Sequence, residues 1–205
     1  MHIWRRVGLA LAGTVILQLF TSCSGESVPG LAPKPSDIEV DTPELRALRE
    51  DAGIDPCEPG TRSSPNEMPD LELACLGGGA STDLQAISGP AVINFWYAAC
   101  PPCRKEMPAI QEFHDRYGEH VQVIGISIDV WPDQALKLVK KTGATYPQLA
   151  DPDTSVTGSD LRIRAFPSFA FIAEDGSVTV HPGGVDSSAE LVDLVESELG
   201  VALGP

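Results

Sequence analysis

The sequence predicts an α/β fold in which a central β-sheet is covered by helices. The nearly continuous apolar run AVINFWY (91–97) is typical of a buried central strand. Directly after it, residues 101–117 repeat apolar side chains at helical spacing, and strands and helices then alternate to the end of the chain. The 205 residues, of which 42% are hydrophobic, suffice for one domain with a sizeable core plus extensions.

The first 22 residues have the order of a secretory signal peptide. A basic segment, MHIWRR, precedes the apolar run VGLALAGTVILQLF, and small residues follow it. The apolar run is shorter than the roughly 20 residues that a membrane-spanning helix needs. We therefore expect residues 1–22 to direct export and to be removed.

Cys23 lies where the apolar run ends. The sequence LFTSC resembles a bacterial lipobox, in which the cysteine becomes the lipid-modified first residue of the mature protein. Phe20 and Ser22 depart from the favoured residues of that motif. The expectation is a lipid anchor on Cys23 at the outer face of the cytoplasmic membrane; the alternative is ordinary cleavage nearby, which leaves a free thiol.

Residues 23–56 are expected to form a tether with a short docking helix, ahead of a domain over 57–205. The first part of the tether is mostly Pro, Gly, Ser and acidic residues, a composition typical of a flexible linker. The helix is predicted over 42–53, with Pro43 in its first turn and Gly53 at its end.

The remaining elements follow from hydrophobic periodicity and turn residues. Alternation predicts a strand over 70–76, and GGGAST is a turn. Further along, the patterns predict a strand (121–129), a helix (132–143), an irregular stretch with a short helical segment (151–164), a hairpin turning at Asp175-Gly176 (167–181) and a closing helix capped by Ser187 (187–199).

The five cysteines of an exported chain can form disulfides. If lipid takes Cys23, four cysteines remain, and these allow three pairings. The proximity of Cys100 and Cys103 favours one of the three, which leaves Cys57 with Cys75 as a structural bridge.

Cys100 and Cys103 are predicted to be a redox pair. Cys100 lies between a strand and the first turn of a helix, where unpaired N–H groups and the helix dipole favour a thiolate. The thiolate is the attacking species in disulfide exchange. Cys103 lies one helical turn further on and can resolve the mixed disulfide. We expect Cys100 to be the exposed thiol and Cys103 the shielded one.

Other chemistries fit the sequence less well. A zinc site would want a second Cys-x-x-Cys or a histidine pair at ligand spacing, and neither is present. An inert staple would close too small a loop to add much stability. The formal charge of −15 argues against a nucleic-acid partner, which would require clustered Lys and Arg.

Four segments together resemble the thioredoxin-like TlpA/ResA family of exported thiol–disulfide oxidoreductases: VINFWYAACPPCRKEMPAI, VIGISID, YPQLADPD and AFPSFAFIAEDGSV. The match runs in order over about residues 66–200. The resemblance implies a thioredoxin fold, with a central mixed β-sheet flanked by helices and an N-terminal extension. It also implies Cys100 as nucleophile, Cys103 as resolving cysteine, and a cis proline at Pro167 facing the pair.

The resemblance further implies that Glu106 is an acidic residue that tunes the thiols; the alternative is a solvated helix carboxylate or an i,i+4 partner. Two positions depart from relatives, and a third differs from thioredoxin itself, as it generally does in TlpA-like proteins. Ala99 stands where a Trp usually precedes the first cysteine, and Phe166 precedes the proline in place of Val, Ile or Thr. Asn94 takes the place of the buried Asp of thioredoxin itself.

The sequence therefore predicts an extracytoplasmic thiol–disulfide oxidoreductase acting on cysteines of other proteins, in cytochrome c maturation or oxidative folding. No dissociable cofactor and no metal is expected, because the dithiol is its own redox group. We expect a monomer with a redox partner in the membrane. Two alternatives stay open: a peroxiredoxin-type thiol peroxidase, and a non-enzymatic copper-binding or carrier module on the same fold.

Overall fold

The computed structural model describes residues 37–61 and 65–204. The expected signal peptide, Cys23 and most of the tether lie outside these residues. The described residues belong to one compact unit, which includes the predicted docking helix. Within this part of the chain, no helix has the length and apolar composition needed to cross a membrane.

The core of the fold is a seven-stranded mixed sheet with the strand order β2-β1-β5-β4-β3-β6-β7. The central strand β3 pairs in parallel with β4, which pairs in parallel with β5; the other pairings are antiparallel. The strands are β1 (Glu72–Cys75), β2 (Thr82–Asp83), β3 (Ala91–Trp96), β4 (Gln122–Ser127), β5 (Gln148–Ala150), β6 (Ser168–Ile172) and β7 (Val178–Pro182).

Capping residues mark several ends of the four α-helices. Thr42 and Ser187 each accept a backbone N–H through the side chain at a helix start, and Gly53 and Gly143 end helices in the left-handed conformation. The helices are α1 (Pro43–Ala52), α2 (Pro101–Tyr117), α3 (Pro132–Thr142) and α4 (Ser188–Leu199); a 3₁₀ turn, η1, covers Leu84–Ala86.

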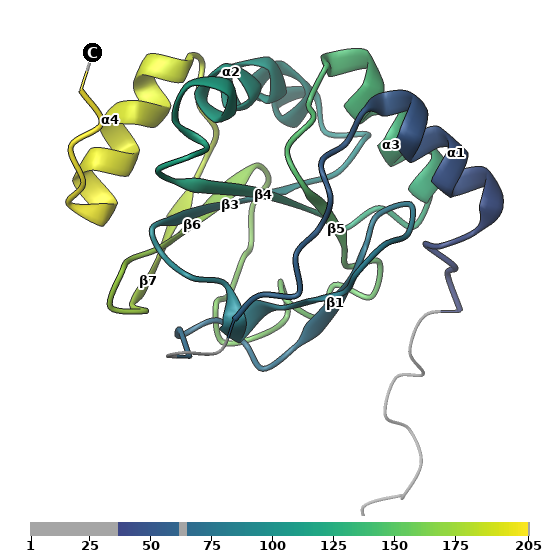
Figure 1. Cartoon of the computed structure of the whole chain (residues 1–205), viewed down its shortest axis with the longest axis horizontal. Coiled ribbons are helices and arrows are strands. Elements are labelled where there is room, and N and C mark those ends of the chain that lie inside the picture. The colour runs from purple at the N-terminus through teal and green to yellow at the C-terminus, as the bar shows by residue number, and fades with distance from the viewer. Residues whose placement is uncertain (1–36, 62–64, 205) are drawn as a thin grey trace, which may run out of the picture. The chain divides into compact units, whose positions relative to one another are not determined.

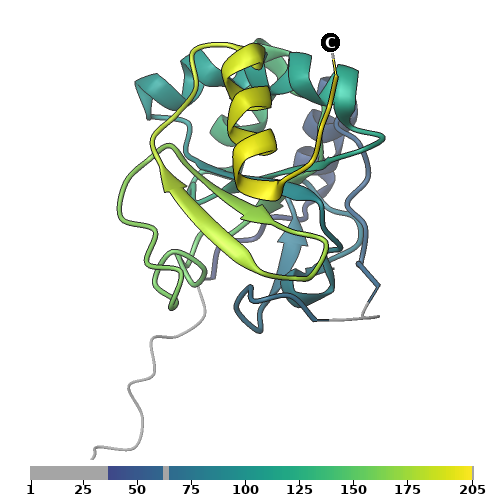
Figure 2. The same ribbon diagram turned by 90° about the vertical axis from the view of Figure 1, so that its left-hand side faces the viewer.

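All four α-helices lie on one face of the sheet (Figure 1). Their buried side chains join one apolar cluster with Val92, Trp96 and Phe169 from the strands. The opposite face holds a second cluster, which loop residues and η1 cover without any contribution from the α-helices. In the view turned by 90°, α4 and α2 again lie above the sheet and the loops below it (Figure 2).

The structure adds two strands that the sequence patterns do not predict. Strands β2 and β5 have two and three residues, too few for an alternation to be recognised. Their pairing with β1 and β4 defines them.

Residues 151–164 form turns without the short helical segment that we expected. Asp151 instead accepts the backbone N–H groups of Ser155 and Val156, which orders this stretch as turns.

The predicted bridge between Cys57 and Cys75 is present, with the Cα atoms 5.9 Å apart. Cys75 belongs to β1, and both cysteines are buried in the second apolar cluster. The bridge therefore ties the segment that follows α1 to an outer strand of the sheet.

Removing this bridge should lower the free energy of unfolding by about 3 kcal/mol, because the bond closes a loop of 18 residues in the unfolded chain. Urea unfolding of Cys57→Ala, Cys75→Ala and the double variant measures the loss. Each single variant already lacks the bond, so the double variant should be only slightly less stable than either. Single losses that add up in the double variant would contradict the assignment.

Candidate active site

The candidate site lies where three chain segments meet at one end of the central strand. The Cys100 loop follows β3 directly. Because β3 and β4 are parallel with Trp96 opposite Ser127, the loop after β4 begins beside the Cys100 loop. Because β6 is antiparallel with Ser168 opposite Phe95, the residues just before β6 lie at the same end. The sheet thus assembles the site from segments far apart in sequence.

Cys100 and Cys103 are joined by a disulfide with a Cα separation of 5.3 Å. Cys100 is the N-cap residue of α2, and its Sγ accepts the backbone N–H of Cys103 at 3.2 Å. The two residues between them are prolines, which have no N–H to donate. The first free N–H of the helix is therefore aimed at the Cys100 sulfur, as expected for a site that stabilises a thiolate.

The exposure of the two cysteines differs from the expectation. Cys100 is 1% exposed and Cys103 0%, so in this oxidised form neither sulfur is open to a partner. Both belong to the apolar cluster on the helix-covered face, against which half-buried Tyr97 and Phe166 pack. The rings of Tyr97 and Phe166 meet edge to face at 5.5 Å between centroids. Exposure therefore does not tell the two cysteines apart; what distinguishes Cys100 is that its Sγ accepts the backbone N–H of Cys103.

Asp129 and Arg104 hold the peptide groups just before Cys100. The Ala98 N–H donates to Asp129 Oδ2 at 2.7 Å, and the Ala98 carbonyl accepts Arg104 Nε at 2.5 Å. Ser127 Oγ donates to the same Asp129 oxygen at 2.9 Å. Burial raises the pKa of Asp129, and the Ala98 and Ser127 donors oppose the rise. Sequence reasoning missed this clamp; an acidic residue directly after a parallel strand was the available signal.

Glu106 is buried, at 1% exposed, on the face of α2 that packs on the sheet. The expected alternative of a solvated carboxylate is therefore wrong. Asn94 in β3 donates its amide to Glu106 Oε1 at 2.9 Å. Burial raises the pKa of Glu106 to about 8, and the Asn94 amide and the Val185 backbone oppose that rise. Such a group takes up and releases protons near neutral pH.

Pro167 follows a cis peptide bond from Phe166, as expected. The residue is buried and immediately precedes β6. A Cβ added to Gly184 would lie 2.7 Å from Pro167 Cγ and 2.5 Å from Glu106 Oε2. Glycine at 184 therefore lets the proline loop and the buried carboxyl group come together.

A polar chain that the sequence analysis did not predict lies in the core beneath the site. The Trp96 indole donates to Gln148 Oε1 at 3.0 Å, and the Gln148 amide donates to the Tyr146 carbonyl at 3.1 Å. Gln148 reaches Trp96 by lying across Gly125, where any Cβ would collide with its side chain. These two hydrogen bonds fix the side chain of Trp96, the last residue of β3.

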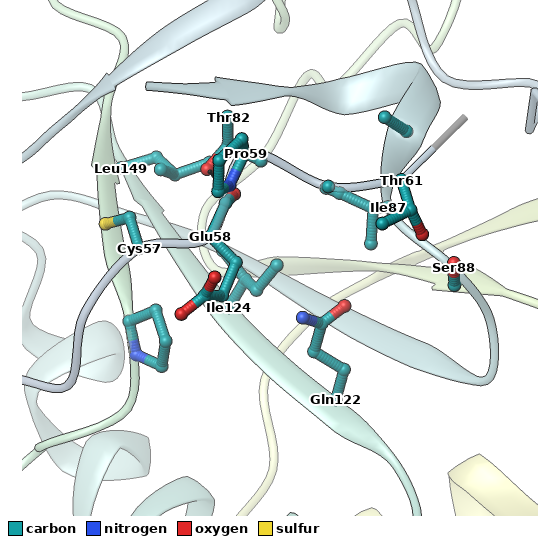
Figure 3. A pocket seen from close by; sticks show the side chains of 13 residues that line it. Cys57, Glu58, Pro59, Thr61, Thr82, Ile87, Ser88, Gln122, Ile124 and Leu149 are labelled. Atoms are coloured by element: carbon teal, nitrogen blue, oxygen red, sulfur yellow. Dashed lines mark hydrogen bonds between the residues drawn. The ribbon is translucent and has the colours of Figure 1, made fainter. Parts of the chain in front are cut away.

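A cavity lies away from Cys100 and Cys103. It has a volume of about 420 Å³ and opens on the sheet face opposite the helices, between Ile124, Leu149 and the segment around Glu58. Figure 3 shows Cys57 at its edge, with the sulfur pointing away from Gln122 and Ser88. Cys57 is only 5% exposed, so the cavity does not open its bridge to solvent.

Comparisons with known proteins agree with this geometry. The chain matches the AhpC/TSA family over residues 65–181. It is 30% identical over 125 residues to the thiol-disulfide oxidoreductase ResA of Halalkalibacterium halodurans, covering 58% of this chain and 70% of the relative. It is 27% identical over 121 residues to the thioredoxin-like protein YneN of Bacillus subtilis, covering 57% and 70%. The resemblance to ResA-like proteins is confirmed.

Solved structures show the same architecture. The structure of MTB DsbF in its mixed oxidized and reduced forms has a TM-score of 0.57 and 28% identity, over 63% of this chain and 98% of that chain. A secreted Mycobacterium tuberculosis disulfide oxidoreductase homologous to E. coli DsbE has a TM-score of 0.53 and 26% identity, over 62% and 96%. The predicted thioredoxin-like fold is confirmed.

Glu106→Gln should change how the stability of the oxidised protein depends on pH. Between the ordinary value of 4.5 and about 8, folded wild-type protein holds a proton on Glu106 that the unfolded chain has lost. Its free energy of unfolding should therefore fall as pH rises through this window, by up to about 1.4 kcal/mol per pH unit, and level off above it. The variant lacks this contribution. Urea unfolding from pH 5 to 9 measures both slopes.

Glu112→Gln is the matched control, because Glu112 is exposed on the same helix. This control should follow the wild-type pH dependence. Equal slopes for wild type and Glu106→Gln would show that Glu106 does not titrate in the way its burial implies.

Proposed function

Because the chain belongs to the AhpC/TSA family and is a thiol–disulfide oxidoreductase, we propose that Cys100 and Cys103 exchange disulfides with cysteines of other exported proteins. The observation that carries the proposal is the Cys103 N–H aimed at Cys100 Sγ at the first turn of α2. A negative charge on that sulfur is stabilised by both the hydrogen bond and the helix dipole. Cys100 is accordingly the nucleophile.

The two cysteines alone carry the electrons of the exchange. In the reducing direction, the Cys100 thiolate attacks one sulfur of a substrate disulfide, forms a mixed disulfide and releases the other substrate thiolate. Cys103 then attacks Cys100 Sγ, which releases the second substrate thiolate and forms the Cys100–Cys103 bond. The protein loses two electrons and the substrate gains them. The oxidising direction runs these steps in reverse.

Glu106 is proposed to act on this exchange as a proton-holding group next to the pair. Its burial beside Asn94 and its contact with the proline loop through Gly184 support that role. A carboxyl group with a pKa near 8 can hold the proton that a cysteine releases when it becomes a thiolate. Pro167 is proposed to line the place where the substrate chain lies.

The biological setting proposed is the outer face of the cytoplasmic membrane. The signal-like residues 1–22 and the lipobox-like segment ending at Cys23 support export and a lipid anchor. The solved relative described as secreted is consistent with export. Reduction of apocytochrome c thiols and oxidation of secreted proteins both suit such a protein, with a membrane partner that resets the dithiol. A measured reduction potential assigns the direction.

Cys103→Ser should accumulate mixed disulfides with partner proteins, because nothing then resolves the bond at Cys100. Cys100→Ser should accumulate none. Non-reducing electrophoresis of both variants, with partners identified by mass spectrometry, measures the difference. Equal trapping by the two variants would refute the assignment of roles. A reaction of reduced wild-type protein with peroxide that outpaces its reaction with protein disulfides would favour the peroxidase alternative.

Cys23→Ala should release the protein from the membrane fraction, because the alanine cannot carry the lipid. Fractionation of cells, together with the mass of the mature N-terminus, measures the anchoring. Ser24→Ala is the control and should stay in the membrane fraction. Membrane attachment of both variants would refute lipid anchoring through Cys23.

A further inference from the structure

Two large apolar side chains are exposed in the described part of the chain, and they are neighbours. Val130 is 49% exposed and Trp131 is 67% exposed. A single exposed apolar residue needs no explanation, but a tryptophan beside a second apolar residue makes an exposed patch. Both follow β4, so they lie at the end of the sheet where the Cys100 loop follows β3.

The position of Trp131 is not explained by the helix that it precedes. Its backbone carbonyl accepts the N–H groups of Gln134 and Ala135 and so begins α3, but its side chain makes no capping hydrogen bond. A residue such as Ser, Thr or Asp would cap the helix better. The ring also takes no part in the buried face of α3. Local structure therefore gives no reason for an exposed indole here.

Trp131 borders a hollow of about 350 Å³ that adjoins the redox loop. Ala98 and Ala99, the two residues before Cys100, form one side of it, and Leu138 contributes an apolar patch from α3. Ala99 is exposed, and its side chain is only a methyl group, so no large side chain covers this side of the hollow. A segment of a partner protein that lies in the hollow would therefore contact the two residues that directly precede Cys100.

The hollow is also positively charged on a strongly acidic protein. The chain has 29 acidic and 14 Lys and Arg residues, yet Arg104, Lys137 and Lys141 all line this one hollow. Asp129 is the one acidic residue among its described lining, and its carboxylate already accepts the Ala98 and Ser127 donors. Lys137 is paired with Asp133 at 2.8 Å, and the charge of Arg104 acts on the Asp129 carboxylate, where it opposes the rise in pKa that burial causes. Lys141 is therefore the lining cation that has no carboxylate partner among the described residues.

We propose that this hollow binds the acidic stretch of a partner protein that flanks its reactive cysteine, with the indole of Trp131 packed against that stretch. The inference rests on the proposed function, because it names the substrate class of the same redox pair. Aromatic residues and arginine dominate the energetics of binding sites, and a local positive patch selects acidic segments. The hydrogen bonds of Asp129 and Arg104 to the Ala98 backbone fix the position of this wall of the hollow relative to Cys100.

The test uses two peptides with one central cysteine linked as a disulfide to thiopyridine, flanked on both sides by Glu in one and by Lys in the other. Attack of Cys100 on the peptide sulfur breaks that bond and releases the coloured thiopyridine; Cys103 then releases the peptide thiol. Reduced wild-type protein should react about fivefold faster with the Glu peptide at low salt. This preference should shrink at high salt.

Two variants probe the hollow itself. Lys141→Glu should abolish or reverse the preference between the peptides, whereas Lys140→Glu, an equal charge change on the same helix but outside the hollow, should keep it. Trp131→Ala should slow both peptides by about tenfold. Equal rates for the two peptides with wild-type protein, or equal effects of the two lysine variants, would overturn the proposal.

A small neutral disulfide separates this proposal from the proposed function. Dithiodipyridine is small and uncharged, so wild-type protein and Lys140→Glu should reduce it at equal rates, while Cys100→Ser should not react. Failure of wild-type protein to reduce it would refute the redox assignment. Normal reduction of dithiodipyridine without discrimination between the peptides would refute the hollow alone.

Discussion

The pairing of β3 with its two neighbours is the constraint on which the rest of the site depends. All six residues of β3 are buried, and the strand is bonded to β4 on one side and β6 on the other. Shifting this strand by one residue would exchange the side chains that face the helices, such as Val92 and Trp96, with those that face the opposite cluster, such as Phe95. The register therefore fixes three things at once: the start of α2 at Cys100, the Asp129–Trp131 loop and the proline before β6.

The buried carboxyl group of Glu106, one turn of α2 after Cys103, lowers the stability of the folded protein. Glu106 is surrounded by the apolar cluster under the helices, where the charged form is disfavoured. Its hydrogen bond to Asn94 compensates for only part of that cost. A leucine or methionine at 106 would suit the core better, so the carboxyl group is better understood through the thiol chemistry than through packing.

The two disulfides differ in what they close and where they lie. The Cys57–Cys75 bond closes a loop of 18 residues and ties a buried segment to β1, so it restricts the unfolded chain. The Cys100–Cys103 bond spans three residues at a helix start and restricts little. Reducing the Cys100–Cys103 bond therefore removes little of the constraint that the disulfides place on the chain. The Cys57–Cys75 bond can stay closed while the Cys100–Cys103 bond opens and closes.

The sequence by itself determined the elements whose signals are local: the helix beginning at Cys100, the caps at Thr42 and Ser187, and the buried runs of β3 and β4. Counting the cysteines predicted both disulfides by a different argument: Cys100 and Cys103 are close in sequence, which left Cys57 and Cys75 to pair with each other. Only the tertiary structure decided the short strands β2 and β5, the burial of Cys100 and Glu106, and the hollow that Ala99, Arg104 and Trp131 line together. These depend on which segments the sheet brings together, and contacts between distant residues leave no periodic pattern in a single chain.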